Sequence, residues 1–352
     1  MKPFTLRSPS IKLVLLSLMH FVTDGLCSFL IFSKLYPYNP YRAILIFFAY
    51  NILAFVTQSP VGIVIDKYNK PKIFLFISIA AMIAGYLLSD FWIISVTLIG
   101  ISNSLFHVAG GKYVTDKSGN DISHLGIFVS TGAIGLVLGQ RYFSFAFLSY
   151  LFFIILIVCG LLFIFSDDAE TKPYSDESDK SKAATVAIFI VIAVVAIRSF
   201  VGKVVSPDFT LSGHMFLVIS IATALGKAMG GVCSDLFGIK LTTYISMSVA
   251  AVCLTLGAGS LPLFLLGVFA FNFSMPITLY YANVLLKGNE GFAFGTLAAT
   301  LTPGYFIAMA FTYSSIVRVC TAVMCILSMI GIIIVSKRIK NNVGAINTDR
   351  NS

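Results

Sequence analysis

The sequence predicts an all-α membrane protein that crosses the bilayer twelve times, with its helices divided into two pseudo-symmetric six-helix bundles. Three observations predict this class: the composition, the number of long apolar runs, and a repeat shared by the two halves. Of the 352 residues, 58% are hydrophobic and only 11% are charged, and the mean hydropathy is +0.94. Soluble domains typically carry about 25% charged residues, so a soluble protein is excluded. The runs are apolar on every face, which disfavours a β-barrel, since barrel strands alternate apolar and polar residues.

Long apolar runs give the number of transmembrane spans. A helix that crosses a bilayer needs roughly 20 predominantly apolar residues. The predicted spans are residues 11–32, 43–65, 73–88, 92–109, 125–140, 143–165, 183–203, 211–232, 241–257, 261–286, 291–311 and 316–335. Very short connectors, marked by Arg141 and Arg318, separate the fifth span from the sixth and the eleventh from the twelfth.

One hydrophilic stretch divides the first six spans from the last six. Residues 166–182 read SDDAETKPYSDESDKSK, with six acidic residues, three lysines and one proline, a composition typical of a solvated linker. We therefore predict an N-terminal membrane bundle over residues 1–165, a cytoplasmic linker over 166–182, a C-terminal membrane bundle over 183–336 and a cytoplasmic tail over 337–352.

Basic residues in the short connections indicate the orientation of the chain. With both termini in the cytoplasm, 17 lysines and arginines fall on the inner side and 5 on the outer side, as the positive-inside rule requires. The net charge of +9 then reflects topology and anionic lipids rather than nucleic-acid binding. We expect a multi-pass protein of the cell (plasma or inner) membrane. The first apolar run is interpreted as a permanent span, because it is long and lacks a small-residue cleavage site.

A charged stretch after the second span has a counterpart after the eighth. The first reads GIVIDKYNKPK and contains Gly62 and Asp66, and the second reads GGVCSDLFGIK and contains Gly231 and Asp235. We call the spacing from Asp66 to Asp235 the repeat offset. The same offset pairs Asn103 with Asn272, Asp121 with Glu290, Gly126 with Gly295, Thr131 with Thr300 and Gly135 with Gly304. A repeat of this kind predicts a doubled fold.

Twelve spans with G-x-x-x-D-K-x-x-K after the second resemble the major facilitator superfamily, over essentially the whole chain. The superfamily usually has a second glycine in this motif, where this chain has Asn69. Asparagine is the non-glycine residue that best tolerates the left-handed conformation that a tight bend needs. The resemblance implies a carrier in which one bundle rocks against the other around a central site. Spans one, four, seven and ten would line that site.

Three further segments are similar to fosmidomycin-resistance-type efflux carriers: MHFVTDG, LFHVAGG and GIFVSTGAIGLVLG. This resemblance slightly favours export over uptake. The chain departs from those carriers at Val108, where they usually have proline, and at Gln140, where their glycine run usually ends in Gly-Pro. Because the Gly-Pro element is associated with proton-coupled antiport, symport, antiport and uniport all stay open.

The superfamily resemblance also predicts a breakable latch on the cytoplasmic side. Asp66 can face the start of span eleven, whose helix dipole favours an anion, and Asp235 would face the start of span five. Lys67 and Lys70 could reach Glu290. The alternative is that these lysines only anchor the topology. The predicted cytoplasmic gate comprises Gly62, Asp66, Lys67, Lys70, Gly231, Asp235 and Glu290, with Asp121 in the mirror position.

Ionisable residues inside spans are costly, at about 2.5–3.5 kcal/mol each on insertion scales, so each marks a candidate site. His20 and Asp24 share one face of span one, and Arg198 lies at a similar depth in span seven. We predict that Asp24 and Arg198 pair across the bundle interface, and that protonation of Asp24 weakens the pair and couples protons to transport. His20 would share the proton, because histidine titrates near neutrality. Asn103 and His107 would line the inner path or cap their helix. A static polar network is the alternative.

The predicted function is secondary active transport of a small organic solute by alternating access, with protons as the candidate coupling ion. One alternative is an intramembrane enzyme that uses His20 and Asp24, although no nucleophile, metal-ligand cluster or phosphate-binding loop accompanies them. Another is a non-transporting receptor built on a carrier fold. We expect a monomer in the lipid bilayer that binds a small molecule, with no metal, cofactor or nucleic acid.

Overall fold

The computed structural model describes residues 10–35, 39–119, 121–166, 174–205, 213–312 and 314–349. The other residues, including 167–173 of the predicted linker and 350–352 of the predicted tail, lie outside the described part. Within it, the secondary structure is helical and contains no strand.

The first six predicted spans are all present as helices. Ser10 begins the first by accepting the N–H of Leu13, and prolines open the second and third, where their missing N–H is not needed. The elements are α1 (Ile11–Leu30) extended by η1 (Ile31–Leu35), then α2 (Pro40–Asn51), η2 (Ile52–Val56) and α3 (Gln58–Tyr68) in one span, α4 (Pro71–Leu87), α5 (Trp92–Ser118), α6 (Ile122–Arg141) and α7 (Ala146–Ile164).

The last six predicted spans are also helical. They are α8 (Lys182–Val204), α9 (Gly213–Phe237), α10 (Ile239–Leu256) with η4 (Gly257–Gly259), α11 (Leu261–Phe271) with α12 (Ser274–Leu285), α13 (Glu290–Ala308) and α14 (Ser315–Asp349). Helix α14 therefore continues into the segment predicted as a tail. Ten of the twelve helical segments are long and apolar enough to cross a membrane, and α4 and α13 fall outside that set.

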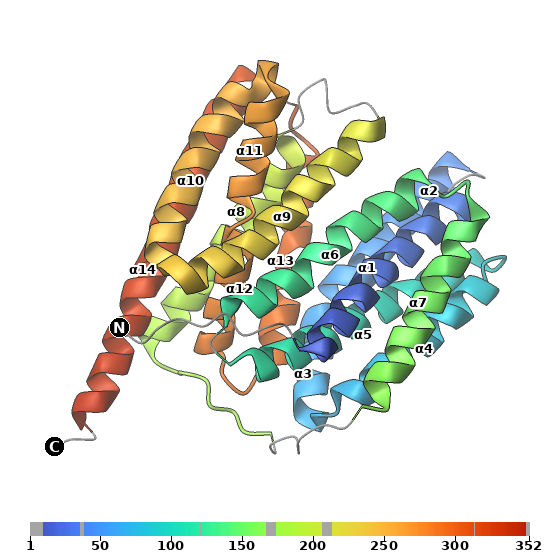
Figure 1. Ribbon diagram of the computed structural model, residues 1–352, viewed down its shortest axis with the longest axis horizontal. Helices are drawn as coiled ribbons and strands as arrows, with labels where there is room; N and C mark the ends of the chain where they lie inside the picture. The colour runs from blue at the N-terminus through green and yellow to red at the C-terminus, as the bar shows by residue number, and fades with distance from the viewer. Residues whose placement is uncertain are drawn as a thin grey trace.

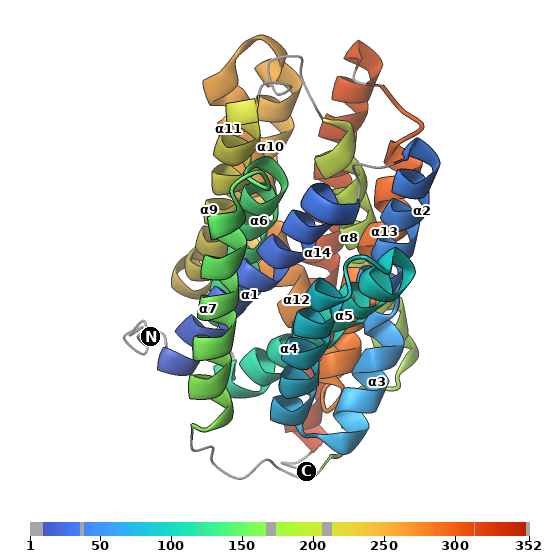
Figure 2. The ribbon, with the colours of Figure 1, turned by 90° about the vertical axis from the view of Figure 1, so that its right-hand side faces the viewer.

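The two halves of the chain repeat the same packing. Helices α1–α7 lie on one side of the molecule and α8–α14 on the other (Figure 1), and most of them run along one common direction (Figure 2). Helix α1 packs along α6 as α8 packs along α13, and α4 packs on α5 as α10 packs on α11. The predicted fold of two pseudo-symmetric helical bundles is therefore confirmed.

Paired glycines show the repeat at the level of single residues. A Cβ atom on Gly135 would lie 1.8 Å from the carbonyl oxygen of Phe21 in α1. On Gly304, its counterpart at the repeat offset, it would lie 2.4 Å from the carbonyl oxygen of Ala196 in α8. Both glycines allow two helix backbones to approach closely. The sequence repeat thus corresponds to a repeated helix–helix contact.

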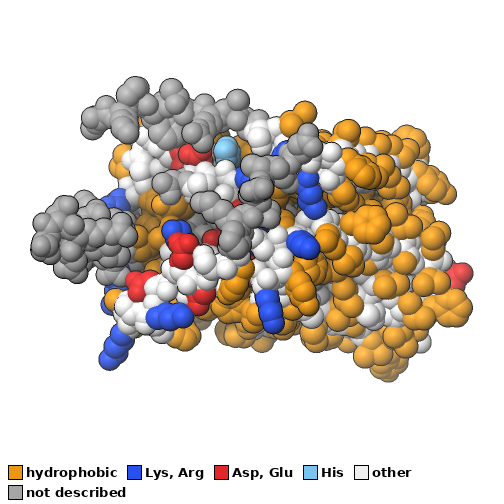
Figure 3. Space-filling model, turned by 90° about the horizontal axis from the view of Figure 1, so that it is seen from below, with side chains coloured by type: hydrophobic (Ala, Val, Ile, Leu, Met, Phe, Trp, Pro, Cys, Tyr) orange, Lys and Arg blue, Asp and Glu red, His pale blue; other side chains and the backbone are white. Residues whose placement is uncertain are grey.

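One end of the molecule carries the described part of the linker, and we call it the linker end. The N–H of Glu177 donates to the carbonyl of Lys287 (3.1 Å) and the N–H of Asp179 donates to that of Leu285 (3.3 Å). Residues 174–181 therefore lie against the turn between α12 and α13. Seen from below, charged side chains gather on one part of the surface and hydrophobic side chains cover another (Figure 3).

Two tight turns follow α3 and α9. Asn69 ends α3 in the left-handed region, at φ 49° and ψ 39°. Gly238, its counterpart at the repeat offset, has φ 82°. The predicted left-handed role of Asn69 is confirmed.

Helix α5 is longer than the predicted fourth span. The prediction ended at residue 109, before two glycines and a lysine, whereas the helix continues to Ser118. Gly110 and Gly111 are buried and face the rings of Phe128 and Phe294, so packing offsets the low helix propensity of glycine. The extension carries Lys112 into the interface between the bundles.

Candidate functional site

A cavity of about 400 Å³ lies between the two bundles. It is lined by helices of both halves, including α1, α5, α8 and α12, which correspond to spans one, four, seven and ten. Its ionisable side chains are Asp24, His20 and His107 on the N-terminal side and Arg198 and Lys227 on the C-terminal side. Much of the remaining lining is apolar, including Phe55, Phe216, Met275, Phe294, Leu297 and Leu301.

Three ionisable side chains of the N-terminal bundle converge in a cluster formed by His20, Asp24 and His107. The Nε2 atoms of the two histidines are 2.8 Å apart. Asp24 Oδ2 lies 3.3 Å from His20 Nε2, and Asp24 Oδ1 lies 3.5 Å from His107 Nε2. The amide of Asn103 donates to Asp24 Oδ1 at 2.9 Å. Two helices far apart in the chain thus meet around one carboxylate.

The Nδ1 atom of each histidine lies at hydrogen-bond distance from a backbone carbonyl, which indicates where the ring hydrogens are. His20 Nδ1 is 2.7 Å from the carbonyl of Phe128, and His107 Nδ1 is 2.8 Å from the carbonyl of Asn103. Carbonyl oxygens only accept hydrogen bonds, so both Nδ1 atoms carry a hydrogen. In two neutral rings, the Nε2 lone pairs would then face each other across the short gap between the rings. A cation shared by the two Nε2 atoms would remove this repulsion, and the Asp24 carboxylate would compensate its charge.

A proton fits this position better than a metal ion. The three ligand atoms all lie within 4.8 Å of one another and could coordinate one ion. Two nitrogens that each lie ~2.1 Å from a tetrahedral metal are about 3.4 Å apart, whereas the two Nε2 atoms are 2.8 Å apart. That separation is a hydrogen-bond distance.

The opposite side of the cavity carries two cationic side chains. Arg198 on α8 is buried, and its Nη1 donates to Thr278 Oγ1 on α12 at 3.1 Å. Lys227 on α9 lines the same cavity. Within the described part of the chain, neither has a carboxylate partner at ion-pair distance. The two sides of the cavity therefore differ in charge.

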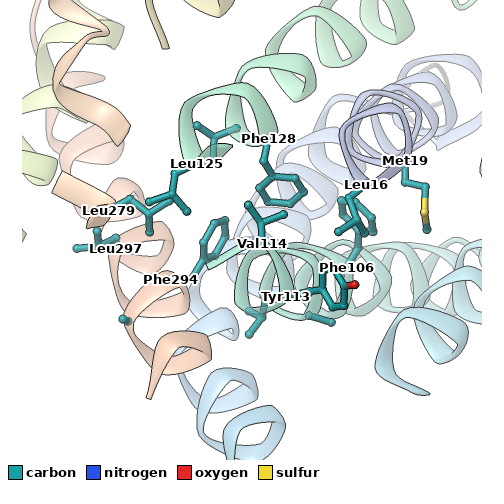
Figure 4. Close-up of a cluster of buried hydrophobic side chains, with 14 of the residues drawn as sticks. Leu16, Met19, Phe106, Tyr113, Val114, Leu125, Phe128, Leu279, Phe294 and Leu297 are labelled. Atoms are coloured by element: carbon teal, nitrogen blue, oxygen red, sulfur yellow. The ribbon is translucent and has the colours of Figure 1, made fainter. Parts of the chain in front are cut away.

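An apolar layer borders the cavity where α13 approaches α5 and α6. Phe294 lines the cavity and points from α13 toward Val114 and Phe128 (Figure 4). Its ring centroid is 6.1 Å from that of Phe128, and a Cβ atom on Gly111 would meet its ring at 2.4 Å. Since Phe294 lies two residues beyond Phe292, which contacts Asp66, this layer separates the cavity from the linker end.

Asp66 joins the two bundles at the linker end. Its carboxylate accepts the N–H groups of Gly291 (2.9 Å) and Phe292 (2.7 Å) in the first turn of α13. These N–H groups have no partner within the helix, and the helix dipole favours an anion there. A Cβ atom on Gly62 would lie 2.4 Å from the Gly291 carbonyl oxygen, so the close approach of α3 and α13 requires glycine.

Asp235 repeats this contact on the other side of the interface. It accepts the N–H groups of Ile122 (2.9 Å) and Ser123 (2.8 Å) at the start of α6. A Cβ atom on Gly231 would lie 2.6 Å from the Ile122 carbonyl oxygen. Two mirrored contacts between a carboxylate and a helix N-terminus therefore close the linker end.

A buried lysine reinforces only the first of these contacts. Lys112 Nζ lies 3.1 Å from Asp66 Oδ1, 3.3 Å from Glu290 Oε2 and 3.5 Å from Asp116 Oδ2. Its side chain is 4% exposed. The residue at the mirror position is Tyr281, so among the described residues the charged cluster has no counterpart on the other side of the interface.

Comparison with solved structures decides the fold. A variant of the Escherichia coli fucose:proton symporter FucP matches with a TM-score of 0.63 and 14% identity, over 95% of this chain and 99% of that chain. FucP in its outward conformation, described as a major facilitator superfamily transporter, matches with a TM-score of 0.67 and 13% identity, over 94% and 99%. A bacterial homologue of the iron transporter ferroportin, in an outward-facing state, matches with a TM-score of 0.59 and 14% identity, over 94% and 98%. The chain has the major facilitator fold. No protein-family model and no curated protein matches its sequence.

Within this major facilitator fold, the predicted pair of Asp24 and Arg198 does not form. Both residues line the cavity, but no ion pair joins them in the described residues. Asp24 is instead bound by Asn103 and the two histidines, and Arg198 turns toward Thr278 on its own bundle. The prediction was wrong because depth along a helix does not fix which way a side chain points.

The predicted contacts of Lys67 and Lys70 with Glu290 were also wrong. Both lysines are exposed, and neither forms an ion pair within the described ranges of the chain. Lys112 reaches Glu290 in their place. Asp121 precedes α6, but its side chain makes no capping hydrogen bond. The structure brings Asp66 and Asp235 to the two expected helix starts, and their role as a gate stays a prediction.

Four residues of the site were missed by the sequence reasoning. Lys112 and Asp116 lie beyond the predicted end of the fourth span, and Lys227 was not among the predicted site residues. Thr278 carried no signal of its own. The signal for Lys227 was its position: it pairs with Gln58 at the repeat offset, and Gln58 lines the same cavity.

We expect Lys112→Met to destabilise the protein strongly, because three carboxylates would lose their shared cation. Removing one partner of a buried ion pair typically costs about 3–5 kcal/mol. Thermal unfolding of the purified protein in detergent checks this. Lys117→Met, an exposed position on the same helix, is the matched control, and Lys112→Arg should retain most of the stability. Equal stability of Lys112→Met and Lys117→Met would contradict the prediction.

Proposed function

We propose that this chain is a secondary active transporter that moves a small organic solute across the cell membrane by alternating access. The observation that carries the proposal is a cavity bounded by both bundles and closed at the linker end by two mirrored contacts. Hydrogen bonds to helix starts can break and re-form, as rocking of the bundles requires. The linker end and both termini face the cytoplasm in this proposal, as the distribution of basic residues suggests.

The coupling ion in this proposal is a proton held by the His20–Asp24–His107 cluster. Support comes from the two Nε2 atoms, whose lone pairs would face each other in two neutral rings, and from the carboxylate that would compensate a proton between them. FucP, a structural neighbour, is described as a fucose:proton symporter. Export is the favoured direction on the sequence resemblance alone.

Helix α5 connects the proton site with the gate. It carries His107 next to the cavity and Lys112 in the gate, and a rise of about 1.5 Å per residue separates them by ~7.5 Å along the axis. Loss of the proton would leave the two Nε2 atoms repelling each other across the α1–α5 contact. A shift of α5 that relieves this repulsion would also move Lys112 away from Asp66 and Glu290.

Flux measurements in liposomes test the proposal. The purified chain would be reconstituted with an entrapped pH-sensitive dye and challenged with sugars, amino acids, organic acids, amines and phosphonates. We expect one class of solute to cross the membrane and to change the internal pH, with no response in empty liposomes. Chemical conversion of a solute would instead identify the enzyme alternative, and binding without flux would identify the receptor.

A further inference from the structure

The two cations on the C-terminal side of the cavity have no part in the proton site. We propose that Arg198 and Lys227 bind an acidic group of the solute, so that the transported compound is an organic anion with an apolar body. This inference rests on the proposed transport function and names the substrate class of the same cavity.

Arg198 is buried and has N–H donors beyond the one that it uses in the described part of the chain. Arg198 is only 8% exposed. Its one hydrogen bond in the described chain is donated by Nη1 to Thr278 Oγ1. A guanidinium has five N–H donors arranged as a fork, which matches a carboxylate or phosphonate in a bidentate way. A buried charge without a carboxylate partner is unfavourable. Binding of an anion from the cavity would satisfy it.

Lys227 brings a second positive charge to the same space. It lines the same cavity as Arg198 and forms neither a hydrogen bond nor an ion pair within the described residues. Two like charges at one low-dielectric cavity repel each other, and an anion bound between them would convert that repulsion into two attractions.

The acid on the other side of the cavity forms no ion pair with these cations in the described part of the chain. Both oxygens of Asp24 are engaged, Oδ1 by Asn103 and His107 and Oδ2 by His20. Gln58, the counterpart of Lys227 in the repeat, is uncharged. The excess positive charge therefore belongs to the C-terminal side alone.

The volume and lining of the rest of the cavity indicate what the non-acidic part of the solute is like. Its volume of about 400 Å³ and its lining of aromatic and aliphatic side chains suit a compact apolar group, as in most small-molecule sites. A simple inorganic anion would leave this surface unused. We therefore assign the acidic head to Arg198 and Lys227 and the apolar body to the space between the bundles.

Three isosteric probes test the charge preference: benzoate, benzamide and benzamidine, which are anionic, neutral and cationic at neutral pH. Their binding to the purified full chain in lipid nanodiscs would be measured by ligand-observed NMR titration. We expect benzoate to bind at least tenfold more tightly than benzamide, and benzamidine to bind most weakly. Arg198→Met and Lys227→Met should each abolish the preference for benzoate.

Two further variants separate charge from folding. Arg198→Lys keeps the charge and should retain part of the preference for benzoate. Lys240→Met removes an exposed lysine on α10 and should leave the preference unchanged. Equal binding of the three probes, tighter binding of benzamidine, no measurable binding of benzoate, or an unchanged preference in both methionine variants would overturn the inference. Because binding requires no flux, failure of transport with an intact anion preference would refute only the proposed function.

Discussion

Replacing Asp24 by asparagine is expected to abolish the effect of a pH gradient on solute flux. The change keeps the size of the side chain, but it removes the only carboxylate beside the paired Nε2 atoms of His20 and His107 in the described chain. Its remaining oxygen can still accept from Asn103. A proton held by the histidines would then be a buried charge without a partner. Breaking a buried ion pair typically costs about 3–5 kcal/mol, so occupancy of the proton site should fall at least about hundredfold.

The measurement is solute flux in liposomes with and without an imposed pH gradient, using the solute found in the panel. Asp90→Asn is the matched control, since Asp90 is exposed and lies between α4 and α5. A response to the gradient that is equal in Asp24→Asn and in the unmodified protein would refute proton coupling at this cluster. It would leave the fold and the cavity untouched.

Replacing Asp66 by asparagine is expected to open the linker end. The carboxylate accepts two N–H groups of α13 and lies 3.1 Å from Lys112 Nζ. An asparagine can accept only with its oxygen, and its NH₂ group would face a backbone donor. Hydrogen bonds to charged groups contribute about 1.5–3 kcal/mol each, so the population open at this end should rise roughly 10- to 100-fold.

Reaction of a cysteine placed at Thr115 would report this opening, in a background without the six native cysteines. Thr115 is buried at the linker end, where its hydroxyl accepts a hydrogen bond from Asn283 on α12 (3.2 Å). The rate of alkylation should rise in Asp66→Asn and in Asp235→Asn. Asp121→Asn is the control, because that side chain makes no capping hydrogen bond. Unchanged alkylation in both gate variants would contradict the latch.

The fold could be predicted from the sequence because it depends on hydrophobicity summed over long segments rather than on single contacts. A mean hydropathy of +0.94 and twelve apolar runs leave few alternatives to a helical membrane protein. The constant repeat offset predicted the doubling, and the structure repeats the backbone contacts of Gly135 at Gly304. Even the left-handed turn at Asn69 followed from local chemistry.

The partners inside the site could not be predicted in the same way. Sequence spacing placed His20 and Asp24 on one face of a helix, but the rotation of α1 against α5 and α8 depends on packing along the whole helix. Asp24 therefore met Asn103 and His107 instead of Arg198. Lys112 was missed because its helix continues through two glycines, which pack against Phe128 and Phe294.

The donors in both gate contacts are main-chain N–H groups, and this affects how such a protein can change over time. Every residue except proline supplies an N–H at the start of a helix, so the identities of Phe292, Ile122 and Ser123 matter little for the hydrogen bonds themselves. Gly291 is different, because a Cβ atom there would lie 2.8 Å from Asp66 Oδ1. The two aspartates must keep their carboxylates, and Gly62, Gly231 and Gly291 must stay small where the backbones approach. Substitutions can accumulate at the other three donor positions while the hydrogen bonds persist, so these contacts depend on few side chains.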